Sequence, residues 1–371
     1  MSVIRPPDHS IIIPFHSNDR LLRLCLETLR RTVPDDVEKI LVMNNHRAEE
    51  LPQIDGSSHF RIVRYDRSLG YSGAINEGAA LARGKTLVFC DSDTFYAGDW
   101  FSQLTRFHQQ TENMGLASSR LLDPATLRVL DFGVAFTTFN APHPQRDVRP
   151  DHQFVCRPRA VQAACSANMI VDARLFETIG GLDVDLGFGY SDLDLCLRLN
   201  ATGRQCWVTS DSTVFHRGDS ASTNREIYKG DVKARFAAKN SHLIQHDMPR
   251  YFEESLKHFQ QTKDFSSAYL LVDLSTVLDR EWHYDLLKAF VKILSIYNYS
   301  PGVRDLSSLS LIDHVGLNVL QTQASILYLV DRFISLKDNQ MWFEIRPYKD
   351  DLVVDRNANV RLLSEVINNV S

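Results

Sequence analysis

The stretch "SLGYSGAINEGAALARGKTLVFCDSD" (68–93) places a glycine-rich segment, an apolar run and two aspartates in immediate succession. The small residues of its first part predict a helix, which Gly84 ends. The apolar run "KTLVFC" (85–90) predicts a buried strand, and Asp91 and Asp93 follow at its carboxyl end. Ligands bind at the carboxyl ends of strands in open parallel sheets, so the two carboxylates mark a candidate site.

The residues before this stretch alternate between strand and helix patterns. Short apolar runs at 10–15, 38–45 and 59–65 predict strands, and 18–32 repeats its apolar residues at helical spacing after a good N-cap. Strands that alternate with helices form βαβ units, whose strands lie parallel in one sheet. We therefore expect an α/β fold with a mostly parallel central sheet flanked by helices.

The composition is that of an ordinary globular protein, with 44% hydrophobic residues, 23% charged residues and a formal net charge of -5. A chain of 371 residues is longer than one core usually supports, so two domains are expected. Nothing in this balance indicates nucleic acid as a partner. The six cysteines form no C-x-x-C pair, which is typical of reduced thiols in the cytosol.

Neither a membrane span nor an export signal is visible in the sequence. No apolar run is long enough for a transmembrane segment, and "MSVIRPPDHS" (1–10) lacks the basic and apolar regions of a signal peptide. The expected location is therefore cytoplasmic.

The last third of the chain differs from the rest in its pattern. Successive segments there are amphipathic at helical spacing, and they include 266–279, 284–297 and 314–336. We expect a domain over 1–244 and a separate helical region over 245–371. Its helices could pack on the first domain, form a homo-oligomer, touch a membrane surface or bind a protein acceptor, and packing is the default expectation.

The aspartate pair has several interpretations when it is taken alone. A D-x-D sequence is most often a turn with solvated carboxylates, but at a strand end it suits Mg²⁺ or Mn²⁺ bridging a diphosphate. A dehalogenase-type phosphatase is disfavoured because Phe95 stands where that class has Thr or Val. The glycine-rich segment fits neither the dinucleotide-binding pattern nor the P-loop pattern.

Five ordered motifs together resemble glycosyltransferase family 2, whose fold is the Rossmann-like GT-A fold. The similar segments are "SIIIPFHSNDRLLRLCLETL" (10–29), "ILVMNN" (40–45), the stretch 68–93, "GGLDVDLGFGYSDLDLCLRL" (180–199) and "VFHRGDS" (214–220). The resemblance covers roughly 10–220 and leaves the remaining tail outside. It implies a nucleotide-sugar half up to about residue 95 and an acceptor half over 96–244.

The resemblance implies a DXD metal site that binds the donor. Asp91 and Asp93 would hold a divalent ion and the donor diphosphate, with His216 as a further ligand. Imidazole beside carboxylate suits Mn²⁺, and Mg²⁺ is the alternative. The expected donor is a nucleotide sugar of the UDP or GDP class. Pro14, Phe15 and His16 match the start of the nucleobase pocket.

Further donor-side positions follow from the same alignment of motifs. Asn44 stands where the family commonly has Asp, and Ser68 stands where it has Asn. Asn44 in place of Asp argues against recognition of the base by a carboxylate at that position. Asp66 has two interpretations, a contact with the base or ribose and a capping role. The remaining expected nucleotide-sugar contacts are Gly73, Asn76 and Ser92.

On the acceptor side the resemblance implies Asp192 as the general base. Ser191 replaces the family's usual Glu, a change that affects acceptor positioning more than catalysis. Gly181 and Tyr190 are the other expected acceptor-side residues. Asp194 lies four residues before Arg198, a spacing that predicts a supporting ion pair on one helix face.

These features together favour a metal-dependent inverting glycosyltransferase, of the hexosyl or a related class. Its acceptor would be a glycan, a lipid-linked glycan or a protein. A sugar-nucleotide nucleotidyltransferase is the nearest rival, but "PFHSNDR" (14–20) lacks the glycine-rich basic loop of that class. A non-catalytic sugar-binding or scaffold protein is a second rival, and it would not need a metal pair, a histidine and a base together.

Overall fold

The computed structural model describes most of the first 262 residues and four short segments of the tail. The described ranges are 7–45, 59–137, 141–187, 189–217, 224–262, 269–272, 326–329, 351–355 and 357–368. Contacts divide the chain into an N-terminal unit, Met1–Val134 with Arg146–Gln245, and a C-terminal unit, Ala135–Gln145 with His246–Ser371. Within the described ranges no helix is both long and apolar enough to cross a membrane.

One large sheet organises the N-terminal unit, with the strand order β3-β2-β1-β4-β9-β6-β10-β5. Its strands are β1 (His9–Phe15), β2 (Glu38–Asn44), β3 (Arg61–Tyr65), β4 (Thr86–Cys90), β5 (Thr94–Phe95), β6 (Met114–Leu122), β9 (Asn168–Asp172) and β10 (Gln205–His216). The first four strands are mutually parallel, while β9 runs antiparallel between β4 and β6. Two short strands, β7 (Val129–Asp131) and β8 (Arg159–Val161), pair with β6 and β10. The expected sheet flanked by helices is confirmed.

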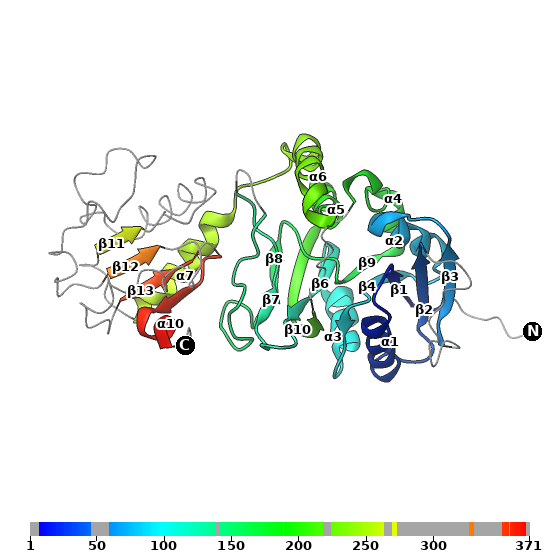
Figure 1. Ribbon diagram of the computed structural model, residues 1–371, viewed down its shortest axis with the longest axis horizontal. Coiled ribbons are helices and arrows are strands. Elements are labelled where there is room, and N and C mark those ends of the chain that lie inside the picture. Colours follow the sequence, from blue (N-terminus) through cyan, green and yellow to red (C-terminus); the bar gives the residue numbers. More distant parts are fainter. Residues whose placement is uncertain are drawn as a thin grey trace, which may run out of the picture. The chain divides into compact units, whose positions relative to one another are not determined.

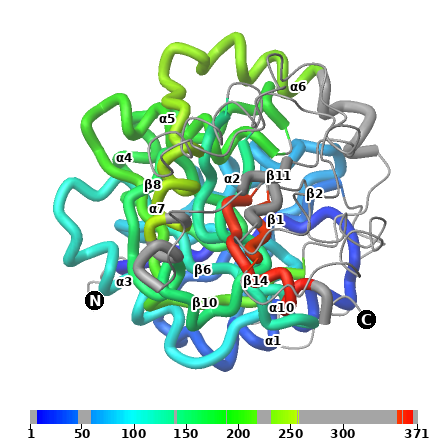
Figure 2. The backbone as a smooth tube through the Cα atoms, turned by 90° about the vertical axis from the view of Figure 1, so that its left-hand side faces the viewer, coloured from blue at the N-terminus to red at the C-terminus, as the bar shows by residue number. Residues whose placement is uncertain are grey.

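Helices cover both faces of this sheet. Figures 1 and 2 show α1 (Asp19–Thr32) and α3 (Trp100–Gln110) on one face, and α5 (Ser191–Ala201) and α6 (Asn224–Asn240) on the other. The further helices of this unit are α2 (Gly70–Leu81) and α4 (Ala173–Thr178). Apolar burial on the two faces supplies the main driving force for this arrangement.

Strand β1 is buried on both faces because its side chains alternate between two helical layers. Ile11, Ile13 and Phe15 belong to the same buried cluster as the apolar residues of α1 and α3. Ile12 points to the opposite face, where Gly78 of α2 packs on it. A Cβ at Gly78 would lie 2.4 Å from Ile12 Cγ2, so this glycine allows α2 to approach the sheet.

The C-terminal unit contains strands as well as helices, so it differs from the expected helical region. Its four-stranded sheet has the order β11-β12-β13-β14. These strands are β11 (Tyr269–Val272), β12 (Ile326–Leu329), β13 (Leu352–Val354) and β14 (Val360–Leu362). Helices α7 (Met248–Thr262) and α10 (Leu363–Asn368) also lie among the described residues of this unit. Helix α7 packs against β14 (Figures 1 and 2).

Short apolar runs explain this correction. "YLLV" (269–272) and "ILYL" (326–329) form strands within two segments that were expected to be helical. A run of four apolar residues is compatible with a buried strand and with part of a buried helix, so periodicity alone does not distinguish the two. The segment 284–297, also expected to be helical, lies outside the described residues.

The segment before residue 146 is a second point that the sequence did not indicate. Gln145 is buried, and its amide donates to Ser255 Oγ at 3.0 Å and to Ala358 O at 3.4 Å. Asp247 Oδ1 accepts from Phe136 N at 2.7 Å. Residues 135–145 therefore belong to the C-terminal unit, although they are inserted within the sequence of the N-terminal unit.

We predict that Gly78→Ala destabilises the N-terminal unit. The added methyl overlaps Ile12 Cγ2, and such overpacking costs about 1–3 kcal/mol, more than the gain of up to about 1 kcal/mol in helix propensity. Urea unfolding followed by circular dichroism measures the difference. In an Ile12→Ala background the overlap with Cγ2 is gone and the close neighbour that remains is Val42 Cγ2 at 3.2 Å, so the same methyl should cost less there. Equal effects in the two backgrounds would contradict the close-packing explanation.

Candidate active site

A tight turn after β4 brings two aspartates to the sheet edge. Asp91 N donates to Ala167 O at 2.9 Å, which continues the pairing of β4 with the β9 side of the sheet. Thr94 N then donates to Asp91 O at 3.1 Å, so the chain turns directly into β5. The side chains of Asp91 and Asp93 are each 22% exposed, which leaves both carboxylates open to a ligand.

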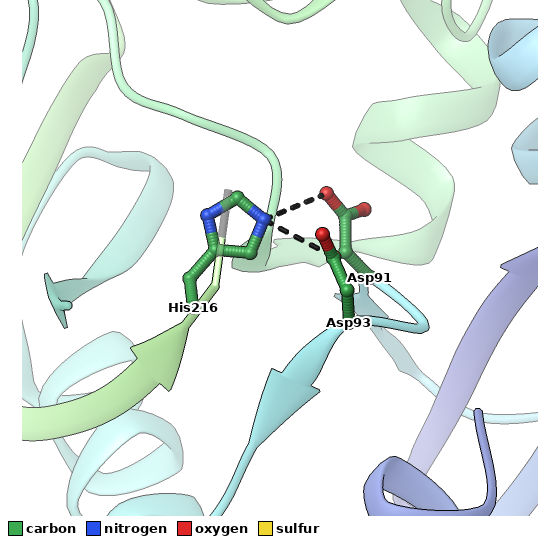
Figure 3. Close-up of side chains that lie close together, drawn as sticks. All are labelled: Asp91, Asp93 and His216. Atoms are coloured by element: carbon green, nitrogen blue, oxygen red, sulfur yellow. Dashed lines mark hydrogen bonds and ion pairs between the residues drawn. The ribbon is translucent and has the colours of Figure 1, made fainter. Parts of the chain in front are cut away.

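His216 reaches this turn from the last residue of β10. Strand β10 pairs antiparallel with β5, with His216 opposite Thr94. Its Nε2 lies 3.1 Å from Asp93 Oδ1 and 3.9 Å from Asp91 Oδ2 (Figure 3). The structure thus brings together the three residues expected as metal ligands, from two segments far apart in sequence.

Electrostatics in this cluster favour a positive charge. Burial and the neighbouring charge of Asp93 raise the pKa of Asp91 to about 6, although His216 favours its ionised form. Burial alone would lower the pKa of His216, but the hydrogen bond with Asp93 and the charges of both aspartates outweigh it and raise this pKa. A proton on the imidazole or a bound cation would relieve the repulsion between the two carboxylates.

The donor atoms fit a divalent metal ion. One carboxylate oxygen from each aspartate and one imidazole nitrogen all lie within 4.8 Å of one another. Two hard oxygen ligands with one nitrogen ligand suit Mn²⁺. Because His216 must lose its proton to act as a ligand, the ion would replace the proton that this cluster favours.

Asp192 lies at the amino end of α5, and it is half-buried. Its Oδ2 accepts from Ser166 N at 3.1 Å and from Ser166 Oγ at 3.2 Å, while Oδ1 accepts from Leu193 N at 2.9 Å. Burial raises the pKa of Asp192, and the hydrogen bonds from Ser166 and Leu193 oppose that shift. The carboxylate is therefore held in one orientation and is more basic than an exposed aspartate.

Two hydroxyls that the sequence did not single out connect Asp192 with Asp91. Tyr71 Oη, near the start of α2, lies 2.9 Å from Asp91 Oδ1 and 2.9 Å from Ser166 Oγ. Ser166 in turn contacts Asp192. No local pattern marks either residue, since Tyr71 reads as a helix residue and Ser166 belongs to a small-residue run.

A family comparison agrees with this geometry. Residues 10–127 match the model named "Glycosyl transferase family 2". This segment is therefore similar to glycosyltransferase family 2 domains. The matched range includes the first four strands of the sheet and the aspartate pair, but it ends before Asp192 and His216.

Relatives of this family 2 domain are longer proteins. The chain is 30% identical over 243 residues to the uncharacterized protein y4gI of Sinorhizobium fredii, which covers 61% of this chain and 26% of that protein. It is 28% identical over 243 residues to the O-antigen biosynthesis protein RfbC of Myxococcus xanthus, which covers 62% of this chain and 19% of RfbC. The chain thus spans about a quarter or less of these relatives.

A solved structure shares the overall fold. The crystal structure of GalNAc-T7 with UDP, GalNAc and Mn²⁺ superposes with a TM-score of 0.50 over 78% of this chain and 57% of that chain. The sequence identity is 14%, so this likeness concerns the fold alone. It agrees with the expected GT-A architecture.

On the donor side of the family 2 domain, Asn44 holds a loop in place. Its Oδ1 accepts from Leu69 N at 2.7 Å and its Nδ2 donates to Gly70 O at 3.1 Å. The side chain is buried and fastens the start of α2 to the end of β2. His16 Nδ1 lies 3.2 Å from the Asn44 carbonyl oxygen, so the end of β1 is tied to the same place.

The other donor-side residues lie in different settings. Pro14 and Phe15 are buried in β1, whereas His16, Asp66 and Ser68 are exposed. Ser92 is half-buried between the two metal-site aspartates, and Gly73 lies in the first turns of α2. Their contact with a nucleotide sugar stays a prediction.

Asn76 and Gly181 hold a second loop, the one that precedes α5. The Asn76 amide donates to Leu182 O at 2.8 Å and accepts from Leu182 N at 2.9 Å. Gly181 has a φ of +68°, and a Cβ there would lie 2.7 Å from Asn76 Oδ1. Both residues therefore position the loop before α5, where Gly181 allows the close approach.

The acceptor-side residues begin helix α5. Tyr190 is its N-cap residue, and its ring lies 5.0 Å from that of Phe236 between centroids. Ser191 is buried, with 1% of its surface exposed. The position where the family usually has Glu is thus part of the packing in this chain.

The expected pair of Asp194 and Arg198 is present and is more buried than a surface pair. Asp194 has no exposed surface, and its Oδ2 accepts from Arg198 Nε at 2.7 Å. The guanidinium also donates to Ile179 O at 2.6 Å and to Gly181 O at 2.7 Å. This pair joins α5, which carries Asp192, to the loop that Asn76 holds.

We predict that Asp194→Asn lowers the free energy of unfolding by about 3 kcal/mol, because it leaves a partly buried guanidinium without its counter-charge. Urea unfolding measures this. Glu27→Gln is the matched control, because Glu27 pairs with Arg31 at the same helical spacing but in solvent, where the loss should stay under about 1 kcal/mol. Similar losses in both variants would show that the Asp194 pair is not a structural support.

Proposed function

We propose that this protein is a divalent-metal-dependent, inverting glycosyltransferase of the hexosyl or a related class. The observation that carries the proposal is the cluster of Asp91, Asp93 and His216 at the sheet edge, with Asp192 connected to it through two hydroxyls. A lone metal site would suit many enzymes. A metal site joined to an oriented carboxylate in a family 2 domain supports transfer of a sugar.

Asp91, Asp93 and His216 would hold the metal ion, with Mn²⁺ preferred and Mg²⁺ as the alternative. When bound, such an ion neutralises the negative charge that develops on a departing nucleoside diphosphate. The expected donor is a nucleotide sugar of the UDP or GDP class. UDP and Mn²⁺ in the GalNAc-T7 crystal support this choice, since that protein has the same fold.

The donor would occupy the edge formed by the ends of β1, β2 and β4. His16, Asp66 and Ser68 are exposed there and would contact a base or ribose, while Asn44 keeps the loop in shape. Pro14, Phe15, Gly73, Asn76 and Ser92 would shape this pocket. These residues hold the donor so that its anomeric carbon faces the acceptor side.

Asp192 would accept the proton of the attacking acceptor hydroxyl. The hydroxyl oxygen forms a bond to the anomeric carbon as the bond to the diphosphate breaks, and the proton moves to the Asp192 carboxylate. Hydrogen bonds from Ser166 N and Leu193 N fix that carboxylate in place. One displacement without a nucleophilic side chain inverts the anomeric configuration.

The acceptor would approach from the side of Gly181, Tyr190 and Ser191. It would be a glycan, a lipid-linked glycan or a protein, and the relative RfbC, named for O-antigen biosynthesis, favours a saccharide.

We also propose the division into a catalytic domain over 1–244, with donor and acceptor halves, and a tail over 245–371 that could mediate homo-oligomers. A cytoplasmic location is part of the same proposal.

Asp93→Ala should abolish Mn²⁺-dependent binding of nucleotide sugars while the fold stays intact. The substitution removes one of the two carboxylates that hold the ion, so the diphosphate loses its counter-charge. Calorimetry with UDP- and GDP-sugars, with and without Mn²⁺, measures it. Asp99→Ala removes an exposed aspartate outside the cluster and should bind as the unchanged protein does. Donor affinity that survives Asp93→Ala would refute the metal site.

Asp192→Asn should lower turnover by about 10²-fold or more, the usual contribution of a positioned base, while donor affinity changes far less. In the unchanged protein, turnover should fall as pH drops through the raised pKa of Asp192, because the protonated carboxyl cannot accept a proton. NMR of the product should show an inverted anomeric centre. Near-normal turnover in Asp192→Asn, or retention of configuration, would rule out this mechanism.

A further inference from the structure

Two hydroxyl groups bridge the metal-side carboxylate and the base. The chain of contacts runs from Asp91 Oδ1 to Tyr71 Oη at 2.9 Å, to Ser166 Oγ at 2.9 Å, and to Asp192 Oδ2 at 3.2 Å. Ser166 is 5% exposed, and Tyr71 is half-buried. The bridge therefore lies largely out of water, where the direction of each hydrogen bond carries weight.

While both carboxylates are ionised, the bridge has fewer hydroxyl protons than oxygen–oxygen contacts. Each hydroxyl donates one proton, so Tyr71 and Ser166 supply two donors for three contacts. The hydroxyls can point in sequence toward Asp192, with Tyr71 donating to Ser166 and Ser166 to the base. They can equally point toward Asp91, with Ser166 donating to Tyr71 and Tyr71 to the metal-side carboxylate. All three contacts become hydrogen bonds only when one carboxyl carries a proton.

The geometry points to Tyr71 and Ser166 as positioning residues that couple the metal and donor site to the general base. This inference rests on the proposed function, because it assumes that Asp91 binds the ion and that Asp192 accepts the proton. Neither residue needs to touch the substrate. Their shared hydrogen bonds make the state of one carboxylate affect the preferred orientation at the other.

The direction of the bridge should change during turnover. A cation on Asp91 would compensate the charge of that carboxylate, so the Tyr71 and Ser166 hydroxyls would both donate in the direction of Asp192 and keep it oriented. When Asp192 has taken the acceptor proton, that proton can be donated to Ser166, Ser166 can donate to Tyr71, and Tyr71 can donate to Asp91. No proton is created or lost, and the three contacts are then all hydrogen bonds.

The backbone holds both ends of the bridge in place. Ser166 N donates to Asp192, and the next residue, Ala167, accepts from Asp91 N at 2.9 Å through its carbonyl. Ser118 Oγ donates to Cys165 O at 3.0 Å and so ties this segment to β6. A single short segment thus fixes the spacing between the two carboxylates.

A double-mutant cycle on Mn²⁺ binding tests the coupling without depending on activity. The dissociation constant of Mn²⁺ alone is measured by calorimetry or electron paramagnetic resonance for the unchanged protein, Tyr71→Phe, Asp192→Asn and the pair. Loss of the Asp192 charge weakens Mn²⁺ binding electrostatically by the same amount in both backgrounds, so this effect cancels in the cycle. What remains is the part carried by the Tyr71 hydroxyl.

We expect the effect of Asp192→Asn on the Mn²⁺ dissociation constant to differ by about twofold or more between the two backgrounds, at the low end of couplings within hydrogen-bonded networks. Ser166→Ala in place of Tyr71→Phe should remove the coupling in the same way, while Ser166 N still holds Asp192. It also serves as the second variant if Tyr71→Phe does not fold.

Tyr65→Phe is the matched control. Tyr65, the last residue of β3, donates at 2.6 Å to Glu77 of α2, the helix that carries Tyr71, but it lies outside the bridge. The Asp192→Asn effect should be unchanged in that background. The coupling is overturned if Mn²⁺ binds and Asp192→Asn changes its dissociation constant equally in the unchanged, Tyr71→Phe and Ser166→Ala backgrounds. That result leaves the proposed function standing. Absence of Mn²⁺ binding in the unchanged protein overturns both.

Discussion

The arrangement of the N-terminal unit centres on the close approach of two like charges at the end of β4. Asp91 and Asp93 are separated by one residue, are partly buried and face the same histidine. Burial and repulsion raise the pKa of Asp91, and the hydrogen bond with Asp93 and the charges of both aspartates raise the pKa of His216. Such a cluster is costly for folding alone, and a divalent cation is the natural compensation. Charge that a fold does not need for stability is a marker of a binding site.

Backbone pairing keeps this costly cluster in place. Strand β5 is only two residues long, yet its pairing with the end of β10 sets His216 beside the aspartate turn. On the other side, the segment 165–167 contacts both Asp91 and Asp192. Ala167 O accepts from Asp91 N, and Ser166 N donates to the Asp192 carboxylate. Strand pairing and short loops thus orient the side chains more firmly than side-chain packing alone, and a site with fixed geometry needs little reorganisation on reaction.

Several residues that match family motifs serve the scaffold. Both ends of the Asn44 and Asn76 amides bind loop backbone. The Asp194 carboxylate pairs with Arg198 and Lys239 and also accepts from Asn240. Each fastens a loop next to the site, so each affects chemistry through geometry. The residues that match family motifs therefore fall into two groups, those that would meet a ligand and those that hold the loops where a ligand would bind.

The sequence by itself determined the local elements and the position of the acidic pair. The strand and helix patterns up to Cys90 are periodic, and Asp91 and Asp93 follow the strand directly, so local spacing is enough to place them at a ligand-binding edge. The partner of the acidic pair was found only through the motif "VFHRGDS", since His216 lies 123 residues from Asp93. Tyr71 and Ser166, 95 residues apart, carry no motif at all. Only the tertiary structure decided that their hydroxyls meet, that 135–145 joins the C-terminal unit and that "YLLV" and "ILYL" are strands. The physical reason is that hydrogen bonds and strand pairing between distant segments leave no periodic trace in the chain, whereas burial of one face of an element does.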